Sequence, residues 1–281
     1  MTMFSANDTI LITGCASGIG KALARRFHQQ GLKVCATARR MEAIADLQAE
    51  GILTLPLDVC NPTQIDALRQ ALQARGLHVR MLVNNAGYGA MGALLDVPHS
   101  TWQDQFEVNL FAPAALVRTF APDMVARRQG MVVNISSISG IAPTPFASPY
   151  CASKAAFNAL SDSLRMELKP FGISVVTVQP GGIRSTFGES AGNKLSLPPD
   201  SLYQPVKAGI LDRAQEGQKN AMPADQFADM VVRSLLSPNC PPVLRFGEKS
   251  ILLPALKRLL PDRLLDAILS RRFKLNDLSA R

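Results

Sequence analysis

The sequence predicts an α/β fold, a single domain built on a doubly wound, seven-stranded parallel sheet with helices on both faces. Short apolar runs rich in β-branched residues alternate with longer segments of helical periodicity. The runs are residues 9–12, 33–38, 52–57, 79–83, 131–135, 173–178 and 242–246. Strands that alternate with helices of about ten or more residues imply right-handed βαβ crossovers, which place the strands parallel in one sheet.

Two regions break this alternation. Residues 182–204 are rich in Gly, Ser and Pro, which is typical of a long loop used as an active-site lid. Residues 252–273 have apolar side chains at helical spacing, a basic complement, and prolines at 254 and 261. We therefore expect residues 1–250 to form the domain and residues 251–281 to form an amphipathic, basic C-terminal extension.

Composition and charge exclude several classes of protein. The net charge of +8 comes mostly from residues 249–281, and no aromatic-rich basic stripe accompanies it, so no nucleic-acid partner is expected. Five cysteines without a CxxC pair and three scattered histidines argue against a metal site. No run approaches the roughly 20 apolar residues of a membrane span, and the start of the chain lacks a signal-peptide layout. A cytoplasmic protein is expected.

A glycine-rich turn joins the first predicted strand to the first predicted helix. It reads Thr13-Gly14-Cys15-Ala16-Ser17-Gly18-Ile19-Gly20. Gly14 permits the tight turn, Gly18 lets the backbone approach a pyrophosphate, and Gly20 allows the helix to pack closely on the strand. The spacing TGxxxGxG differs from the GxGxxG of other Rossmann proteins. Alone, the turn is also consistent with a purely structural role, but between this strand and this helix it predicts a dinucleotide site.

The end of the second strand predicts which dinucleotide binds. NAD sites carry an acidic residue about 20 positions after the turn, where this chain has Ala38 followed by Arg39 and Arg40. An arginine grips a 2′-phosphate with forked, charge-assisted hydrogen bonds, so NADP is the expected cofactor and NAD the alternative. The alternative interpretation is that both arginines have no role in binding and only flank a surface loop.

Polar residues follow the third and fourth strands. Asp58, which precedes Val59, can accept a hydrogen bond from an adenine amino group, although an Asp often simply begins a loop. After the fourth strand, the run Asn85-Ala86-Gly87 suits a turn that backs the cofactor closely. Both segments lie at the carboxyl edge of the predicted sheet, where ligands bind in open parallel sheets.

Tyr150 and Lys154 stand four residues apart on one face of a predicted helix. A phenol has an ordinary pKa of about 10, and a neighbouring ammonium group would favour its ionised form. Ser137 lies thirteen residues before Tyr150, at the end of a strand, and belongs at the same crevice. We expect Ser137 to hold a substrate carbonyl while Tyr150 donates or removes the proton.

Together these motifs resemble those of the short-chain dehydrogenase/reductase family over residues 9–247. The matching residues are Thr13, Gly14, Gly18, Gly20, Asp58, Asn84 to Gly87, Asn109, Ser137, Tyr150, Lys154, Pro180 and Gly181. The resemblance implies that Tyr150 is the general acid or base and that Lys154 lowers its pKa and holds the nicotinamide ribose. It further implies that Asn109 anchors a relay water. The nicotinamide pocket would be shaped by Pro180, Gly181, Ile183 and Thr186.

The resemblance is nearest to the branch with 17β-hydroxysteroid dehydrogenases, retinol dehydrogenases and acyl-dihydroxyacetone-phosphate reductases. It implies an NADP(H)-dependent oxidoreductase that interconverts a carbonyl and an alcohol on a bulky, apolar small molecule. Ser137, Phe146, Tyr150 and Phe187 are the expected substrate contacts, although such apolar residues are more often simple packing. The alternatives are an NAD-dependent alcohol dehydrogenase and a non-catalytic NADP-binding regulator.

The helices suggest two further interactions, one with a second copy of the chain and one made by the C-terminal stretch. The helices that carry Asn109 and Tyr150 are apolar on more than one face, and in relatives these two helices form a dimer, so a homodimer or homotetramer is predicted. The C-terminal helical stretch is expected to pack on the domain or across a dimer. The sharper alternative is that it rests on anionic lipid, as a peripheral membrane contact.

Overall fold

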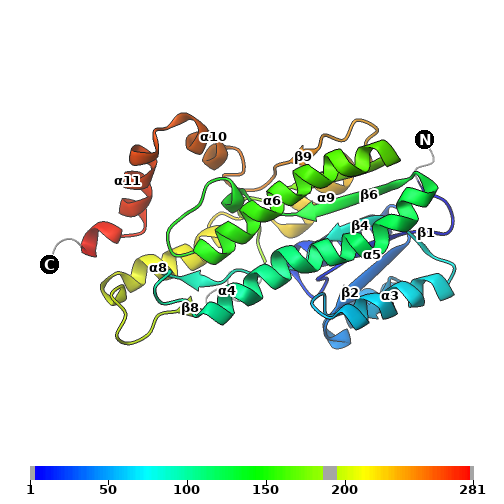
Figure 1. Ribbon diagram of the computed structural model, residues 1–281, viewed down its shortest axis with the longest axis horizontal. Coiled ribbons are helices and arrows are strands. Elements are labelled where there is room, and N and C mark those ends of the chain that lie inside the picture. Colours follow the sequence, from blue (N-terminus) through cyan, green and yellow to red (C-terminus); the bar gives the residue numbers. More distant parts are fainter. Residues whose placement is uncertain (1–3, 186–194, 279–281) are drawn as a thin grey trace.

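In a computed structural model, which describes residues 4–185 and 195–278, the apolar runs form one seven-stranded sheet (Figure 1). Its order is β3-β2-β1-β4-β6-β7-β9, and every neighbouring pair is parallel. The strands are β1 (Asp8–Ile12), β2 (Val34–Ala38), β3 (Leu53–Pro56), β4 (His78–Asn84), β6 (Gly130–Ile135), β7 (Ile173–Val178) and β9 (Val243–Leu244). The predicted α/β class and strand count are confirmed, and only the last strand is much shorter than expected.

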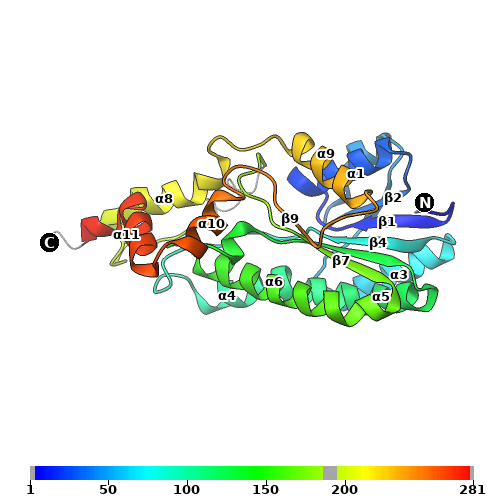
Figure 2. The ribbon, with the colours of Figure 1, turned by 90° about the horizontal axis from the view of Figure 1, so that it is seen from above.

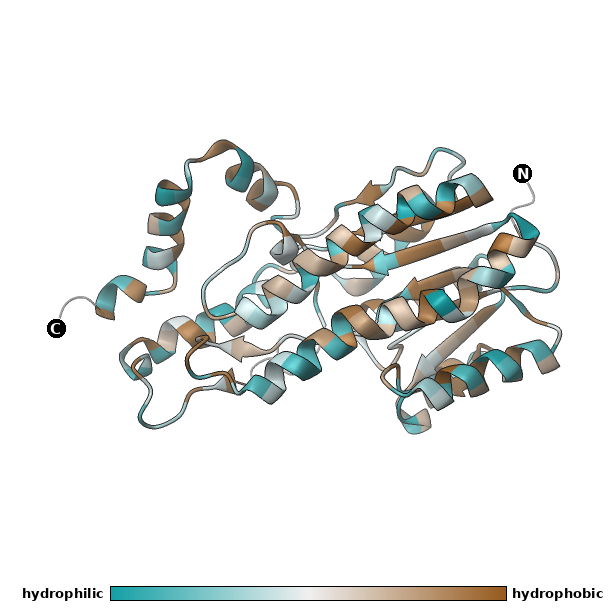
Figure 3. Ribbon diagram, in the orientation of Figure 1, coloured by the Kyte–Doolittle hydropathy of each residue, from teal (hydrophilic) through white to brown (hydrophobic). Residues whose placement is uncertain are grey.

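Helices cover both faces of the sheet (Figure 2). On one face lie α1 (Gly18–Gln29) and α9 (Ala224–Leu235); on the other lie α3 (Pro62–Ala74), α5 (Ala112–Arg127) and α6 (Ser148–Leu168), with α4 (His99–Phe106) continuing that layer. Successive residues of a strand point to opposite faces, so Ile10 and Ile12 join one buried cluster and Leu11 joins the other. The strands carry many hydrophobic residues, with hydrophilic ones among them (Figure 3).

Apart from the two C-terminal helices, the remaining helical elements are short. They are α2 (Ala45–Ala49), α8 (Lys207–Gln215), the 3₁₀ turns at Met41–Ile44, Ile138–Gly140, Lys169–Phe171, Gln204–Val206, Glu216–Gln218 and Leu275–Leu278, and a π-helical segment at Glu107–Phe111. No helix in residues 4–185 and 195–278 is long and apolar enough to cross a membrane.

The chain leaves β1 in one direction for β2 and β3, and β4 lies on the other side of β1. This reversal opens a crevice at the carboxyl ends of β1 and β4, which is where ligands bind in doubly wound sheets. The glycine turn follows β1 at this edge, and Ser137 follows β6.

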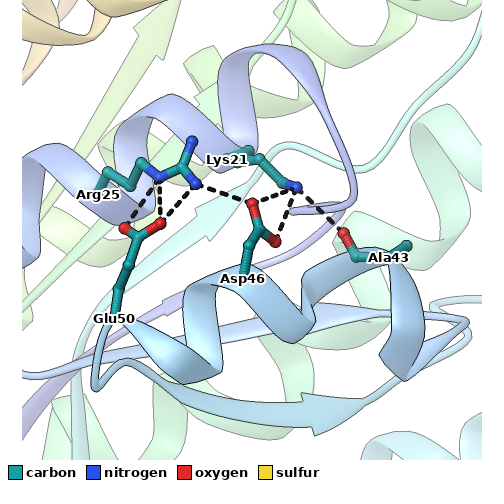
Figure 4. Close-up of polar contacts among 5 residues, drawn as sticks. All are labelled: Lys21, Arg25, Ala43, Asp46 and Glu50. Carbon is teal, nitrogen blue, oxygen red and sulfur yellow. Dashed lines mark hydrogen bonds and ion pairs between the residues drawn. The ribbon is translucent and has the colours of Figure 1, made fainter.

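Ion pairs hold α1 against α2, the helix that follows Arg39 and Arg40 (Figure 4). The Lys21 amine donates to both carboxylate oxygens of Asp46, at 3.0 and 2.9 Å, and to the carbonyl of Ala43 at 3.2 Å. Arg25 bridges Asp46, at 2.8 Å, and Glu50. Exposed pairs contribute little individually, but this network links the glycine turn to the segment after β2.

A two-stranded sheet and the C-terminal helices lie at the same end of the molecule (Figure 1). β5 (Met91–Gly92) pairs in parallel with β8 (Leu195–Ser196), a pairing of two residues that the sequence did not predict. The predicted lid, residues 182–204, contains residues 186–194, which lie outside the described residues. Its role as a lid stays a prediction.

The C-terminal stretch forms two helices, α10 (Leu252–Leu259) and α11 (Asp262–Arg272). Pro261 restricts Leu260 to an extended backbone with ψ 142°, which ends α10, whereas Pro254 lies in the first turn and is tolerated. Leu265 and Phe273 are buried, Phe273 against Phe146 and Ile210, so part of the expected apolar stripe packs on the domain. The division of the chain at residue 250 stays a prediction.

Candidate active site

The carboxyl ends of the strands border a cavity of about 740 Å³, within the range of ligand sites in proteins. It contains most of the residues that the sequence singled out. These are Gly14, Ser17, Gly18, Ile19, Arg39, Asp58, Val59, Asn85, Ala86, Gly87, Ser137, Tyr150, Lys154, Pro180, Gly181 and Ile183. In the described part of the chain, no group of three or more His, Cys, Asp or Glu residues is placed to hold a metal ion.

Five predicted site residues lie outside the cavity lining: Thr13, Gly20, Arg40, Asn109 and Phe146. Phe146 is buried and its ring meets Tyr203 edge-on at 5.9 Å, so it is a core residue close to the site rather than a wall of it. Two other predicted residues, Thr186 and Phe187, lie outside the described residues.

The glycine turn is closed by contacts that leave no room for side chains. Gly14 has φ +72°, and a Cβ there would lie 2.7 Å from the Cα of Ala86. A Cβ on Gly20 would collide with the amide of Asn85. The Thr13 hydroxyl accepts hydrogen bonds from the backbone amides of Asn85, at 3.1 Å, and Ala86, at 3.0 Å. Thr13 therefore ties the turn after β1 to the turn after β4 rather than facing a ligand.

The same end of the cavity fits a dinucleotide. The N-terminus of α1 opens into it at Gly18 and Ile19, where backbone amides and the helix dipole favour an anion. Arg39 lines the cavity and is exposed, with no salt bridge to any carboxylate among the described residues. Asp58 lies at the cavity with one oxygen accepting from the Cys60 amide at 3.0 Å. The residues present thus offer a glycine turn for phosphates and one free cation at its end.

Tyr150 and Ser137 are hydrogen-bonded to each other through their side chains, deep in the cavity. Burial raises the pKa of Tyr150 to about 12, and the hydrogen bond from Ser137 opposes this rise. The Ser137 hydroxyl also accepts from the Ser139 amide at 3.0 Å, which fixes its position at the start of the turn Ile138–Gly140. The pair presents a protonated phenol and a hydroxyl side by side.

Lys154 lies one helical turn after Tyr150, only 5% exposed. Its amine donates to the Ile135 carbonyl at 2.9 Å, and burial lowers its pKa to about 7. The sequence led us to expect that Lys154 would lower the pKa of Tyr150. The pKa of Tyr150 is instead raised, because burial disfavours the charged forms of both side chains. Lys154 is not among the groups that act on the pKa of Tyr150.

Asn109 is fully buried in the π-helical segment Glu107–Phe111 and does not line the cavity. Its side-chain oxygen accepts from the Tyr88 amide at 3.2 Å, and its nitrogen donates to the Tyr88 carbonyl at 3.1 Å and to the Ser153 hydroxyl at 3.1 Å. Single-turn π segments are frequent at functional sites. Here the segment lets Asn109 join the turn after β4 to the helix that carries Tyr150.

Several cavity residues carried no signal in the sequence. Arg213 and Ala214 come from α8, Gln218 from the turn after it, and Leu253 from α10. Their place depends on how the segments after residue 195 fold over the sheet edge, which periodicity does not reveal. Arg213, in particular, lies in a helix of mixed composition, and nothing at its sequence position marks it as buried.

Comparison with known proteins identifies similar chains of one kind. Residues 8–195 match the short chain dehydrogenase family. A short-chain dehydrogenase of Penicillium crustosum is 39% identical over 233 residues, covering 82% of this chain and 84% of that protein. An NADPH-dependent 1-acyldihydroxyacetone phosphate reductase of Schizosaccharomyces pombe is 32% identical over 238 residues, covering 82% and 79%.

Solved structures agree with these relatives. A short-chain dehydrogenase from Streptomyces avermitilis superposes with a TM-score of 0.80 at 30% identity, covering 98% of each chain. Two further neighbours, each 26% identical, differ in cofactor. A serine dehydrogenase is complexed with NADP⁺ (TM-score 0.75, covering 85% and 94%), and a Burkholderia phymatum protein is in complex with NAD (TM-score 0.78, covering 92% and 94%).

Proposed function

Because the chain belongs to the short-chain dehydrogenase/reductase family, a family of oxidoreductases, we propose that it interconverts a carbonyl and an alcohol with NADP(H). The observation that carries the proposal is the buried, hydrogen-bonded pair of Tyr150 and Ser137 beside Lys154. This pair shares one cavity with the glycine turn and Arg39. Each part alone is common; their convergence in one cavity supports an active enzyme over a binding protein.

When bound for carbonyl reduction, NADPH would supply a hydride to the carbonyl carbon. Tyr150 donates its phenolic proton to the carbonyl oxygen, and Ser137 orients that oxygen by a hydrogen bond. A phenol whose pKa is about 12 is fully protonated at neutral pH, so the acid is ready before the substrate binds.

The Lys154 amine, held on the Ile135 carbonyl, lines the same cavity as Tyr150 and is assigned the return of a proton to it. Its pKa of about 7 makes it a proton donor and acceptor near neutral pH. In alcohol oxidation the same residues act in reverse, and Tyr150 must first lose its proton. The positive charge of the oxidised nicotinamide favours that loss.

Arg39 supports NADP over NAD. It follows Ala38 at the end of β2, where an acidic residue would repel a 2′-phosphate, and its guanidinium faces the cavity without a salt bridge in the described chain. Arg40 does not line the cavity, so the preference is assigned to Arg39 alone. NAD stays the alternative.

The cavity that Tyr150 lines suits a substrate with an apolar body. Met91, Ile138, Ala142, Ala214 and Leu253 line it. Together with the relative named for reducing 1-acyldihydroxyacetone phosphate, this supports a bulky, lipid-like carbonyl compound.

A panel of aliphatic, steroid and retinoid aldehydes and ketones, offered with NADPH and with NADH, tests this function. Consumption of NADPH that depends on a carbonyl compound is the expected result. Oxidation of alcohols with NAD⁺ but not NADP⁺ would establish the NAD-dependent alternative. Cofactor binding without turnover of any compound would favour the non-catalytic regulator.

We also propose that two copies associate through the π segment with α5 and through α6. Phe111 is 55% exposed and Met166 is 63% exposed on these helices, which lie side by side (Figure 1). Light scattering at micromolar concentration is expected to give at least the mass of a dimer. A monomer mass would refute this assignment.

The C-terminal helices have a second apolar side besides the one packed on the domain. Ile251, Leu252, Leu259, Leu264 and Ile268 are exposed. Basic side chains accompany them on the same two helices, namely Lys257, Arg258, Arg263, Arg271 and Arg272. This combination supports a peripheral contact with anionic lipid, in keeping with a lipid-like substrate.

A further inference from the structure

Arg213 is a buried cation in the catalytic cavity. It lies in α8, is 7% exposed, and lines the cavity that holds Ser137 and Tyr150. Its Nε donates a hydrogen bond to the hydroxyl of Thr144, another cavity residue. Its two terminal nitrogens make no hydrogen bond or ion pair with the described residues. The four N–H groups of these two nitrogens are therefore available as hydrogen-bond donors to a ligand in the cavity.

Lys249, another cation of the cavity lining, is paired with a carboxylate. Lys249 donates to Glu216 at 2.9 Å, and Arg272 contacts the second oxygen of the same carboxylate at 2.6 Å. Glu216 is thus engaged twice. Within residues 4–185 and 195–278, no carboxylate forms a salt bridge with Arg213.

An arginine is always charged, and burying a charge without a partner is costly. The fork of a guanidinium matches the paired oxygens of a carboxylate or a phosphate. Arg213 and Tyr150 line the same cavity, and the charge of Arg213 lowers the pKa of Tyr150. A ligand with an anionic group would give the Arg213 guanidinium the charged partner that it does not have among the described residues.

We propose that Arg213 binds an anionic group of the carbonyl substrate, a carboxylate or a phosphate monoester, and that Thr144 positions the guanidinium. This rests on the proposed function, since the carbonyl of the same molecule is placed at Tyr150. The apolar wall around Met91, Ala214 and Leu253 receives the rest of the molecule. The substrate class is therefore an amphipathic oxo acid or oxo phosphate rather than a neutral, wholly apolar ketone.

Calorimetric titration of the NADP⁺-saturated protein tests this without turnover, because the cofactor occupies the other anion-binding parts of the cavity. The probes are hexyl phosphate, hexanoate, 1-hexanol and inorganic phosphate. We expect one or both alkyl anions to bind about 10- to 150-fold more tightly than hexanol, as a hydrogen-bonded charge predicts. The better of the two anions identifies the headgroup, and tight binding of inorganic phosphate alone would overturn the apolar half of the proposal.

Arg213→Gln is expected to abolish the preference for the anion, and Arg213→Lys to keep part of it. Lys207→Gln removes the same charge from an exposed position of the same helix and is expected to keep the full preference. Thr144→Val should weaken anion binding, and Thr144→Ser should restore it. Turnover of 4-oxopentanoate against its methyl ester gives a second measure, since the ratio of kcat/KM values should fall about 10- to 150-fold in Arg213→Gln.

Equal binding of hexanol and the anions, or an anion preference that survives Arg213→Gln in a folded protein, would overturn the proposal. Turnover of neutral ketones with no anion preference would overturn this inference and leave the proposed function standing. An anion preference that depends on Arg213, in a protein that reduces no carbonyl compound, would overturn the proposed function and leave anion binding by Arg213 standing.

Discussion

Replacing Lys154 by methionine is expected to stabilise the cofactor-free protein at neutral pH while it removes activity. The pKa of Lys154 falls from 10.5 to about 7 on burial, and one unit corresponds to about 1.4 kcal/mol, so the buried ammonium group costs about 4 kcal/mol at pH 7. Methionine has no such cost, but it leaves the Ile135 carbonyl without its 2.9 Å hydrogen bond, a loss of about 1–3 kcal/mol. The net gain at pH 7 is about 1–3 kcal/mol.

The pH dependence is the sharper part of this prediction. Between pH 7 and 10.5 the unfolded wild-type chain binds one more proton at Lys154 than the folded chain, so its free energy of unfolding rises with pH. At pH 9.5 the cost of burial has fallen to about 1 kcal/mol. The advantage of Lys154→Met should therefore shrink by about 3 kcal/mol between pH 7 and pH 9.5. Tyr150, with a pKa of about 12, stays protonated throughout.

Urea denaturation of both proteins without cofactor, at fixed ionic strength and at several pH values in this range, measures the difference. Other titrating groups are common to both chains and cancel. Lys207→Met, at an exposed position, is the matched control and should follow the wild-type curve. Parallel curves for wild type and Lys154→Met would show that Lys154 is not a buried amine with a lowered pKa.

Two other substitutions and one deletion test separate parts of the account. Ser137→Ala should lower kcat about 10- to 100-fold with little change in NADPH affinity, because it removes one hydrogen bond to the reacting oxygen; equal losses in both would point to a collapsed site. Arg39→Ala should weaken NADPH binding about 10- to 150-fold and spare NADH, whereas Arg40→Ala, off the cavity, should change neither; a wild-type protein that binds both cofactors equally would contradict this. Deleting residues 252–281 should abolish co-sedimentation with anionic vesicles in a protein that stays folded, and absence of wild-type binding at low salt would leave the C-terminal helices as packing alone.

The strands and the catalytic motif could be predicted because each depends on local sequence. A strand buried on both faces needs a short apolar run, and the turn after β1 needs glycine at φ +72° for Gly14, whatever the rest of the chain does. Tyr150 and Lys154 share a helix face by spacing alone. The family, inferred from the same motifs, is confirmed by the matching relatives.

What escaped prediction depends on packing between distant segments. Arg213 reaches the cavity only because α8 lies across the end of the sheet, and β5 and β8 are each too short to leave a pattern. Phe146 was expected to face the substrate, but its left-handed backbone, at φ 62°, accompanies packing against Tyr203. The raised pKa of Tyr150 likewise follows from burial, which no spacing rule measures.

The most direct test of the central claim, that Tyr150 supplies the proton in NADPH-dependent carbonyl reduction, is Tyr150→Phe. The substitution removes the hydroxyl and keeps the ring, so packing around the 7% exposed side chain is preserved. With the best carbonyl substrate from the panel, kcat should fall by about 10²–10⁴-fold, while the NADPH dissociation constant, measured by nucleotide fluorescence, stays close to the wild-type value. A Tyr150→Phe protein whose kcat remains within about tenfold of wild type would contradict the account, because a general acid contributes more than that.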